Sequence, residues 1–325
     1  MRSFQVQQLG SSPSLVETEC PALEQNDVMV KIEACGLNFA DLLMIKGEYQ
    51  DTPEPPFTLG MEVSGTVERV GAGVSFPPAG ARVAVFGGSG GLAEYGMFPA
   101  DRCVLLPDAM PFTDAAAFMV AYGTSHLALE HKARLKSGET LLVLGAAGGV
   151  GLTAVEIGKV MGARVIACAR GAEKLAVAKA MGAHHLIDAT TEDIREVCKS
   201  LGGVDVVYDP VGGNQFTAAL RSCNPEARIL TIGFASGTVP QVPANHLLVK
   251  NISLIGFYWG GYLKFNPKAL TDSLATLFSW YADGKIKPHI SEIFPLERAA
   301  EGLDLLRSRK STGKVVIEMQ RPSAD

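Results

Sequence analysis

The sequence predicts an α/β protein in which a doubly wound parallel sheet is inserted into a β-rich domain. Three observations lead to this fold class. About the first 115 residues carry short alternating runs separated by Gly/Pro turns, the middle of the chain alternates apolar strands with helical patterns, and the tail mixes two helices with a strand. With 325 residues, 47% of them hydrophobic, the chain has enough apolar material for two domains with separate cores.

The β-rich start is recognised by its strand patterns. VMVKIEAC (28–35), EVSGTVERV (62–70) and ARVAVF (81–86) are alternating or β-branched runs. Turn residues at Gly71–Gly73 and Pro77–Gly80 separate them. This part therefore reads as a small antiparallel β-domain.

The middle of the chain repeats a strand–helix unit. The expected strands are LLVLG (141–145), RVIACA (164–169), HLID (185–188), VDVVYD (204–209), RILTIG (228–233) and ISLIGF (252–257). The expected helices between them lie near 149–162, 172–182, 191–201 and 213–223. Near-continuous apolar strands joined by helical crossovers predict a parallel sheet covered on both faces. Six such strands are the number found in the dinucleotide-binding fold.

The tail differs from the middle. Residues 267–283 and 295–308 read as amphipathic helices, and STGKVVIEM (311–319) reads as a closing strand. This mixture predicts that the first domain is discontinuous. The expected parts are 1–117 with 260–325 for the substrate domain, and 118–259 for the inserted nucleotide domain.

The glycine-rich segment that follows the first of the six strands predicts a phosphate site. It reads Ala146-Ala147-Gly148-Gly149-Val150-Gly151, which is G-x-G-x-x-G with Ala at the first glycine and an extra Gly145 before it. Tight turns alone could explain the glycines. Their place after a strand and at the start of a helix favours a pyrophosphate bound at the helix N-terminus. The expected cofactor contacts are Gly145, Ala147, Gly148, Gly149 and Val150.

The end of the second strand indicates which dinucleotide binds. NAD-binding proteins usually carry Asp or Glu there, to bond the ribose 2′-hydroxyl. This chain has Ala169 followed by Arg170, with Lys174 one helical turn further on. Both cations could be ordinary surface residues, but together they favour the 2′-phosphate of NADPH.

Charge and composition exclude other classes. The net charge is −5 without a basic block, so nucleic-acid binding has no electrostatic support. The longest apolar stretch is rich in glycine and is interrupted by Glu156 and Lys159, so no membrane span is expected. The N-terminus lacks the apolar core of a signal peptide, and the six cysteines form no CxxC pair. We therefore expect a cytoplasmic protein with reduced cysteines.

The whole chain resembles the zinc-free branch of the medium-chain dehydrogenases/reductases, the zeta-crystallin-like NADPH:quinone oxidoreductases. The motifs that carry the resemblance are ACGLNFADLLMIKGEY (34–49), PPFTLGMEVSGTVERVGAGV (55–74), AYGTSHLAL (121–129), GAAGGVG (145–151), DPVGG (209–213), GFYWG (256–260) and GKVVIEM (313–319). The resemblance implies a GroES-like catalytic domain holding a Rossmann domain. It also implies a homodimer formed through the sixth strand, NISLIGF (251–257).

The same resemblance predicts that no catalytic zinc is bound. Zinc-dependent members have Cys in the loop that here reads Gly36–Asp41, and His in a Gly-His-Glu triplet. This chain has Asn38 in the loop and Gly60-Met61-Glu62 at the triplet. Asn and Met are poor zinc ligands. Cys35 beside the loop reads as a small buried hydrophobe.

Loss of zinc favours a reaction that needs no Lewis acid. Reduction of a quinone by NADPH fits, because the extended π-system spreads the developing charge. Two alternatives stay open. One is reduction of an enone, alkenal or enoyl-thioester. An acyl-CoA thioester would need cations along an entry groove, and Lys46 and Lys264 are the two candidates. The other is a non-catalytic NADPH-binding protein. The natural acceptor, the choice between hydride and single-electron transfer, and the existence of a dedicated proton donor also stay open.

Three residues of the β-rich domain are the expected catalytic group. Asn38 could donate a hydrogen bond to a substrate or ribose oxygen, or it could only cap a loop. Asp41 is expected mainly to be a structural or cofactor-ordering acid. Tyr49 has a phenol that could donate to a carbonyl or stack on a quinone, although it could equally be a half-buried surface aromatic. Water could deliver the proton instead.

The remaining expected contacts lie near the nicotinamide. Thr124 matches the family position beside that ring. Lys314 could approach the cofactor or could be an ordinary surface lysine, and Trp259 could be an interdomain packing residue. Ligands of open parallel sheets bind at the carboxyl ends of the strands. The expected contacts there are Gly233, Phe234, Phe257, Tyr258 and Trp259. No histidine is assigned to chemistry.

Overall fold

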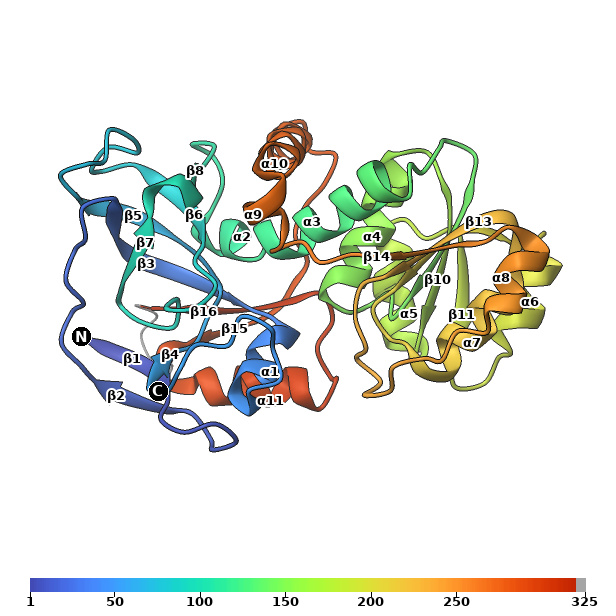
Figure 1. The fold of residues 1–325 in the computed structure, drawn as a ribbon, viewed down its shortest axis with the longest axis horizontal. Helices are drawn as coiled ribbons and strands as arrows, with labels where there is room; N and C mark the ends of the chain where they lie inside the picture. The colour runs from blue at the N-terminus through green and yellow to red at the C-terminus, as the bar shows by residue number, and fades with distance from the viewer. Residues whose placement is uncertain (320–325) are drawn as a thin grey trace. The chain divides into compact units, whose positions relative to one another are not determined.

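The computed structural model describes residues 1–319, which form two compact units. Among these residues, unit 1 consists of Met1–Val120 and 288–319, and unit 2 consists of Ala121–Lys287. Figure 1 shows the first and last parts of the chain, blue and red, within the same unit. Unit 1 is therefore discontinuous in the sequence, and unit 2 lies between its two segments.

Unit 1 is built on two sheets. The larger has the order β15-β16-β3-β5-β6-β8, with β7 paired to β3, and the smaller has the order β2-β1-β4. The strands are β1 (Arg2–Val6), β2 (Ser14–Glu17), β3 (Asp27–Leu37), β4 (Phe57–Thr58), β5 (Glu62–Val70), β6 (Arg82–Phe86), β7 (Tyr95–Pro99), β8 (Cys103–Leu105), β15 (Ile290–Pro295) and β16 (Lys314–Glu318). The helices are α1 (Phe39–Lys46), η1 (Ala100–Arg102), α2 (Phe112–Ala116), η3 (Leu296–Arg298) and α11 (Ala299–Arg307).

The strand register of unit 1 brings distant parts of the sequence together. β16 runs antiparallel to β3, with Val315 opposite Leu37. β5 runs antiparallel to the other edge of β3, with Glu62 opposite Gly36. The first residues of β5 and β16 are therefore level with the end of β3. This corner of the sheet carries the polar cluster described below.

Unit 2 contains a six-stranded sheet in which every pairing is parallel. Its order is β11-β10-β9-β12-β13-β14, which is the doubly wound order of dinucleotide-binding domains. The strands are β9 (Thr140–Leu144), β10 (Arg164–Ala169), β11 (His185–Asp188), β12 (Val204–Asp209), β13 (Cys223–Thr231) and β14 (Ser253–Gly256). β9 is buried along its whole length, as expected for a strand covered on both faces. The predicted fold class is confirmed.

Unit 2 also contains the helices that come before, between and after these strands in the chain (Figure 1). They are α3 (Met119–His126), which begins in unit 1, η2 (Leu127–Lys132), α4 (Gly149–Val160), α5 (Ala172–Ala180), α6 (Ile194–Ser200), α7 (Gly213–Ser222), α8 (Ala244–Lys250), α9 (Tyr262–Phe265) and α10 (Pro267–Ala282). η2 continues α3 as a π-helix, which the sequence did not predict.

The structure corrects the second domain boundary. Residues 260–287, expected in the substrate domain, belong to unit 2. The reason is the packing of α10 against the end of α3. His126 Nδ1 lies 2.8 Å from the Ser273 hydroxyl oxygen, and the His126 ring meets Trp280 edge-on at 5.1 Å. An amphipathic pattern predicts that a helix buries one face but not which domain receives it.

Candidate active site

A buried lysine lies at the corner of the large sheet in unit 1. The Lys314 ammonium donates to Asn38 Oδ1 at 2.7 Å, to the Leu37 carbonyl at 2.9 Å and to Glu62 Oε1 at 2.5 Å. Lys314 is 4% exposed and Glu62 is 1% exposed. The alternative of a surface role for Lys314 is therefore wrong, and its approach to the cofactor stays a prediction. Three acceptors, one of them charged, compensate the buried ammonium.

The ammonium fixes the orientation of Asn38. Because lysine can only donate, the amide oxygen of Asn38 must face Lys314. The amide nitrogen then donates to Glu62 Oε1 at 2.9 Å and to the Gly36 carbonyl at 3.2 Å. Both amide hydrogens are engaged inside the protein. To make the predicted hydrogen bond to a substrate or ribose oxygen, Asn38 would have to release one of these two bonds.

Glu62 is held at both carboxylate oxygens. Oε1 accepts from Lys314 and Asn38, and Oε2 accepts from the backbone N–H of Val120 at 2.9 Å. The carboxylate thus ties β5 to β16, to the loop after β3 and to the start of α3. Sequence reasoning noted Glu62 only as part of a triplet, because its partners are far away in the chain.

Asp41 is a structural acid in this arrangement. Its carboxylate accepts from the backbone N–H groups of Asn38 at 2.7 Å and Gly60 at 3.2 Å. It is fully buried. Loss of hydration raises the pKa of Asp41 to about 6, while the two backbone hydrogen bonds and the nearby Lys314 charge act in the opposite direction. Asp41 therefore holds the start of α1 against the loop that precedes β5.

Tyr49 lies beyond the end of α1. That helix begins after Asn38 and ends at Gly47, whose φ of 76° closes it in the left-handed conformation. Tyr49 follows in a turn, half-buried, and its carbonyl accepts from the Thr52 hydroxyl at 2.6 Å. Its catalytic role stays a prediction.

The residues at the positions where zinc-dependent members carry their ligands do not form a metal site. Met61 and Cys35 are buried, and burial raises the pKa of the Cys35 thiol well above its ordinary value. Within residues 1–319, no three His, Cys, Asp or Glu side chains are grouped so that they could hold a metal ion. The cation at this corner is the Lys314 ammonium.

The glycine-rich turn of unit 2 has the geometry of a phosphate site. Gly145 has a φ of 59°, and the N–H of Gly148 donates back to its carbonyl at 2.9 Å. A Cβ on Gly151 would lie 2.2 Å from the Gly145 carbonyl oxygen, so only glycine fits there. α4 starts directly afterwards, and Gly148 as N-cap offers no side-chain acceptor. The first N–H groups of α4 are thus left for a ligand, which fits a dinucleotide pyrophosphate.

The end of β10 carries the expected cations. Arg170 is exposed, and no hydrogen bond or ion pair of its guanidinium occurs among residues 1–319. Lys174 lies on α5, half-buried. The neighbouring acid is Asp188, opposite Ala169 in the parallel register. Its carboxylate accepts from the Gly171 N–H at 3.1 Å and from Thr190, bonds that lower the pKa of Asp188.

Thr124 lies on α3 and is 7% exposed. The neighbouring Ser125 fixes this helix. Its hydroxyl lies 2.8 Å from the Thr153 hydroxyl on α4 and 3.0 Å from the Tyr208 hydroxyl on β12. The position of Thr124 is therefore set relative to the phosphate-binding helix. Sequence reasoning missed Ser125, since a lone serine in a helix carries no signal.

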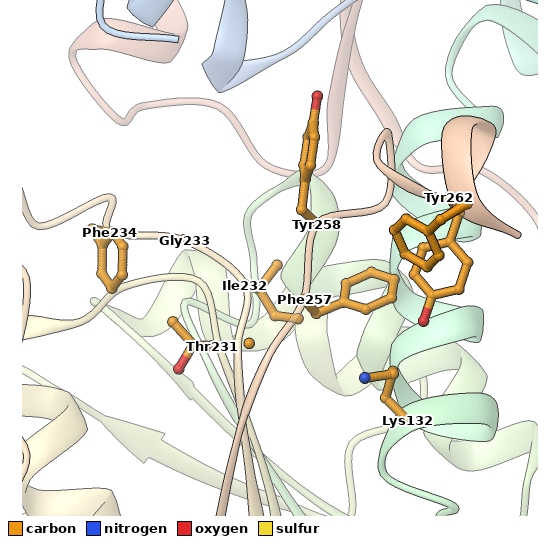
Figure 2. A pocket seen from close by; sticks show the side chains of 10 residues that line it. Lys132, Thr231, Ile232, Gly233, Phe234, Phe257, Tyr258 and Tyr262 are labelled. Carbon is orange, nitrogen blue, oxygen red and sulfur yellow. The ribbon is translucent and has the colours of Figure 1, made fainter. Parts of the chain in front are cut away.

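The residues after β13 and β14 differ in their roles. Trp259 is 4% exposed and packs on Gly123, where an added Cβ would lie 2.6 Å from the indole nitrogen. Trp259 thus packs inside unit 2. Gly233, Phe234, Phe257 and Tyr258 instead line a pocket of about 510 Å³ at the carboxyl ends of the strands (Figure 2). The structure brings these four expected residues together.

A second buried acid lies on α4. Glu156 accepts from the Tyr122 hydroxyl at 2.5 Å and from the backbone N–H of Lys287 at 2.9 Å. Tyr122 and Lys287 lie near the two ends of unit 2 in the chain. Burial raises the pKa of Glu156 to about 7, against the opposing effect of its hydrogen bonds and Lys159. In the sequence, Glu156 stands out only as a charge that interrupts an apolar run.

Comparison with known proteins assigns the family. The model of the alcohol dehydrogenase GroES-like domain matches residues 24–108, and the model of the zinc-binding dehydrogenase domain matches residues 149–277. A quinone oxidoreductase-like protein 2 homolog of Nematostella vectensis is 40% identical over 328 residues, which cover 98% of this chain and 89% of the relative.

Solved structures agree with this assignment. The quinone oxidoreductase of Escherichia coli complexed with NADPH is 30% identical, with a TM-score of 0.91 over 98% of this chain and 100% of that one. The quinone oxidoreductase of Thermus thermophilus, also solved in complex with NADPH, is 33% identical, with a TM-score of 0.86 over 98% and 100%. No helix among the described residues is long and apolar enough to cross a bilayer. The chain is a member of the zinc-free quinone oxidoreductase family of medium-chain dehydrogenases/reductases.

Proposed function

We propose that the protein is an NADPH-dependent reductase of quinones that works without zinc. The observation that carries this proposal is the buried Lys314 ammonium bonded to Asn38 and Glu62. A fixed positive charge in this corner repels a divalent cation. The hydrogen bonds of the ammonium also occupy Asn38 Oδ1 and Glu62 Oε1, the oxygen atoms that could otherwise turn toward such a cation. A reaction that needs no Lewis acid at the acceptor suits such a site.

The cofactor part of the proposal depends on the glycine turn and on Arg170. The N–H groups at the start of α4 would hold the pyrophosphate, and Gly151 keeps that helix close to β9. Arg170 would pair with the 2′-phosphate in a bidentate arrangement. When bound, NADPH supplies the hydride equivalent. The relatives solved with NADPH support this choice of cofactor.

Replacing the cation at the end of β10 tests the choice of NADPH. We expect Arg170→Ala to raise the Kd for NADPH by about 10- to 100-fold, because a charge-assisted hydrogen bond contributes about 1.5–3 kcal/mol. The Kd for NADH should change by less than about twofold. Titration by nicotinamide fluorescence measures both constants, with Arg221→Ala as an exposed arginine control. Equal losses for the two cofactors would contradict the assignment.

The acceptor would be reduced with little direct help from charged groups. A conjugated dicarbonyl spreads the charge that develops on reduction over both oxygens. Proton delivery from water then suffices, since the amide hydrogens of Asn38 are engaged. The protein would contribute positioning and exclusion of water at the aromatic strand ends.

A small acceptor panel separates the proposal from its alternatives. We expect NADPH oxidation with benzoquinone and phenanthrenequinone to be faster than with an alkenal or crotonyl-CoA. Turnover confined to the alkenal or the thioester would favour an enone or enoyl-thioester reductase. Tight NADPH binding without turnover of any acceptor would favour a non-catalytic protein.

We also propose a homodimer formed through β14. This strand is an edge of its sheet, and Leu254 on it is 38% exposed. Leu248 and Val249 on α8 are each 78% exposed. An apolar edge with unpaired backbone groups requires cover.

A charge on this edge tests the dimer. We expect Leu254→Lys to convert a dimer into a monomer of 34.4 kDa by light scattering after size-exclusion chromatography. Leu105→Lys is the matched control, because Leu105 is 46% exposed on β8, the edge of the other large sheet. An unchanged mass for Leu254→Lys, or a wild-type monomer, would contradict this interface.

The cytoplasmic location stays part of the proposal. All six cysteines are unpaired, and Cys35, Cys168, Cys198 and Cys223 are buried. Buried free thiols suit a reducing compartment.

A further inference from the structure

The pocket at the strand ends of unit 2 contains a charged side chain that the proposed function does not use. Among the described residues that line it, Lys132 alone is charged. The apolar wall contains Ile232 and five aromatic side chains, those of Phe234, Phe257, Tyr258, Tyr262 and Phe265. A pocket of about 510 Å³ accommodates a ligand of two or three fused rings.

The aromatic wall is organised around Tyr262. Its ring centroid lies 5.7 Å from that of Phe257 and 4.6 Å from that of Phe265, with tilted planes. Phe265 is 69% exposed, and Tyr258 and Phe234 are each 37% exposed. Exposed aromatic faces gathered at one pocket mark a binding surface, and they suit a planar ring that can stack or meet them edge-on.

Lys132 reaches this pocket from the end of the π-helix η2. The N–H of Ala133 donates to the Ala128 carbonyl at 2.9 Å, so the wide turn persists to the end of η2. π-helical turns are rare and often lie at functional sites. Figure 2 shows the amino group of Lys132 directed toward the side of the pocket where Thr231 and Phe257 lie. Within residues 1–319 this ammonium has no hydrogen bond or ion pair, so its charge is available to a ligand.

We propose that this pocket selects acceptors that combine a planar aromatic ring with an anionic substituent, a carboxylate or a sulfonate. The ring would lie against Tyr262 and Phe265, which are not among the expected cofactor contacts, and the anion would pair with Lys132. Attraction between opposite charges is stronger beside an apolar wall than in bulk water. The inference rests on the proposed quinone reductase function, because it names the class of acceptor that the same site takes.

Binding of fluorescent probes tests the pocket without turnover. Anilinonaphthalene sulfonate carries the required anion, and phenylnaphthylamine is its neutral counterpart. We expect Lys132→Met to raise the Kd of the sulfonate about tenfold, a change of about 1.4 kcal/mol, and that of the neutral probe less than about twofold. Lys132→Arg should bind both probes like the wild type. Lys136→Met is the matched control, an exposed lysine outside the pocket lining.

Steady-state kinetics then test the link to catalysis. With a naphthoquinone sulfonate, Lys132→Met should lower kcat/KM about tenfold through KM, and with the parent naphthoquinone it should change little. The inference would be overturned if Lys132→Met had equal effects on the charged and neutral probes, or on the charged and neutral naphthoquinones. It would also be overturned if Lys136→Met had the same effect as Lys132→Met. If no quinone is turned over, the proposed function fails, and the probe pair alone decides whether the pocket binds aromatic anions.

Discussion

Lys314→Met is expected to lower the free energy of unfolding by about 3–5 kcal/mol, because it leaves Glu62 and Asp41 buried without their cation. Met has a similar length, so the loss reflects charge more than volume. The Lys314 ammonium bonds Glu62, and its charge opposes the burial that raises the pKa of Asp41. Urea unfolding followed by circular dichroism measures the change. Lys310→Met, an exposed lysine in the loop before β16, is the control and should stay within about 0.5 kcal/mol of wild type.

The double variant separates charge from packing. Lys314→Met combined with Glu62→Gln removes both members of the ion pair, so we expect it to be more stable than the sum of the single effects predicts, by about 1–3 kcal/mol. Strict additivity, or a Lys314→Met protein as stable as the wild type, would contradict the buried ion pair.

The stability of the protein is expected to fall as the pH rises from 4.5 to about 7, because of Glu156. Its pKa is 4.5 when unfolded and about 7 when folded, so within this window the folded state binds more protons than the unfolded state. Stability then decreases with pH. The full effect is about 3 kcal/mol, and it is complete above the folded pKa. Asp41, whose pKa is raised from 3.8 to about 6, adds a loss of the same sign at lower pH.

Glu156→Gln isolates this contribution. The amide oxygen can still accept from the Lys287 N–H, and the amide nitrogen can face the Tyr122 hydroxyl. We expect the variant to lose most of the decline between pH 4.5 and about 7, and to be more stable than wild type at about pH 8. Thermal unfolding across this range measures it, with Glu173→Gln, an exposed acid on α5, as the control. A decline that persists unchanged in Glu156→Gln would contradict the assignment.

Local features of the site could be predicted from the sequence. The turn Gly145–Gly151 follows a strand and begins a helix. The glycines that this tight turn needs are therefore visible within a short stretch of the sequence. The structure agrees, since a Cβ at Gly151 would collide with the Gly145 carbonyl. The aromatic residues after β13 and β14 could likewise be placed at one edge, because the carboxyl ends of parallel strands lie together.

Features that depend on strand register could not be predicted. Lys314 and Glu62 are 252 positions apart, and they meet only because β5 and β16 both pair with β3 in a particular register. From the sequence alone Lys314 looked as much like a surface residue as a functional one. The same applies to Glu156, whose partners come from the two ends of unit 2. Lys132 was missed because nothing in LEHK distinguishes a π-helix from an α-helix.

We propose that this site reduces quinones with NADPH and without zinc. The most direct test of this proposal is NADPH oxidation with phenanthrenequinone, using protein dialysed against a chelator and analysed for metal in the same sample. We predict full activity in protein with far less than one zinc per chain, and no gain when zinc is added. Activity that disappears with the metal and returns with stoichiometric zinc would contradict the account.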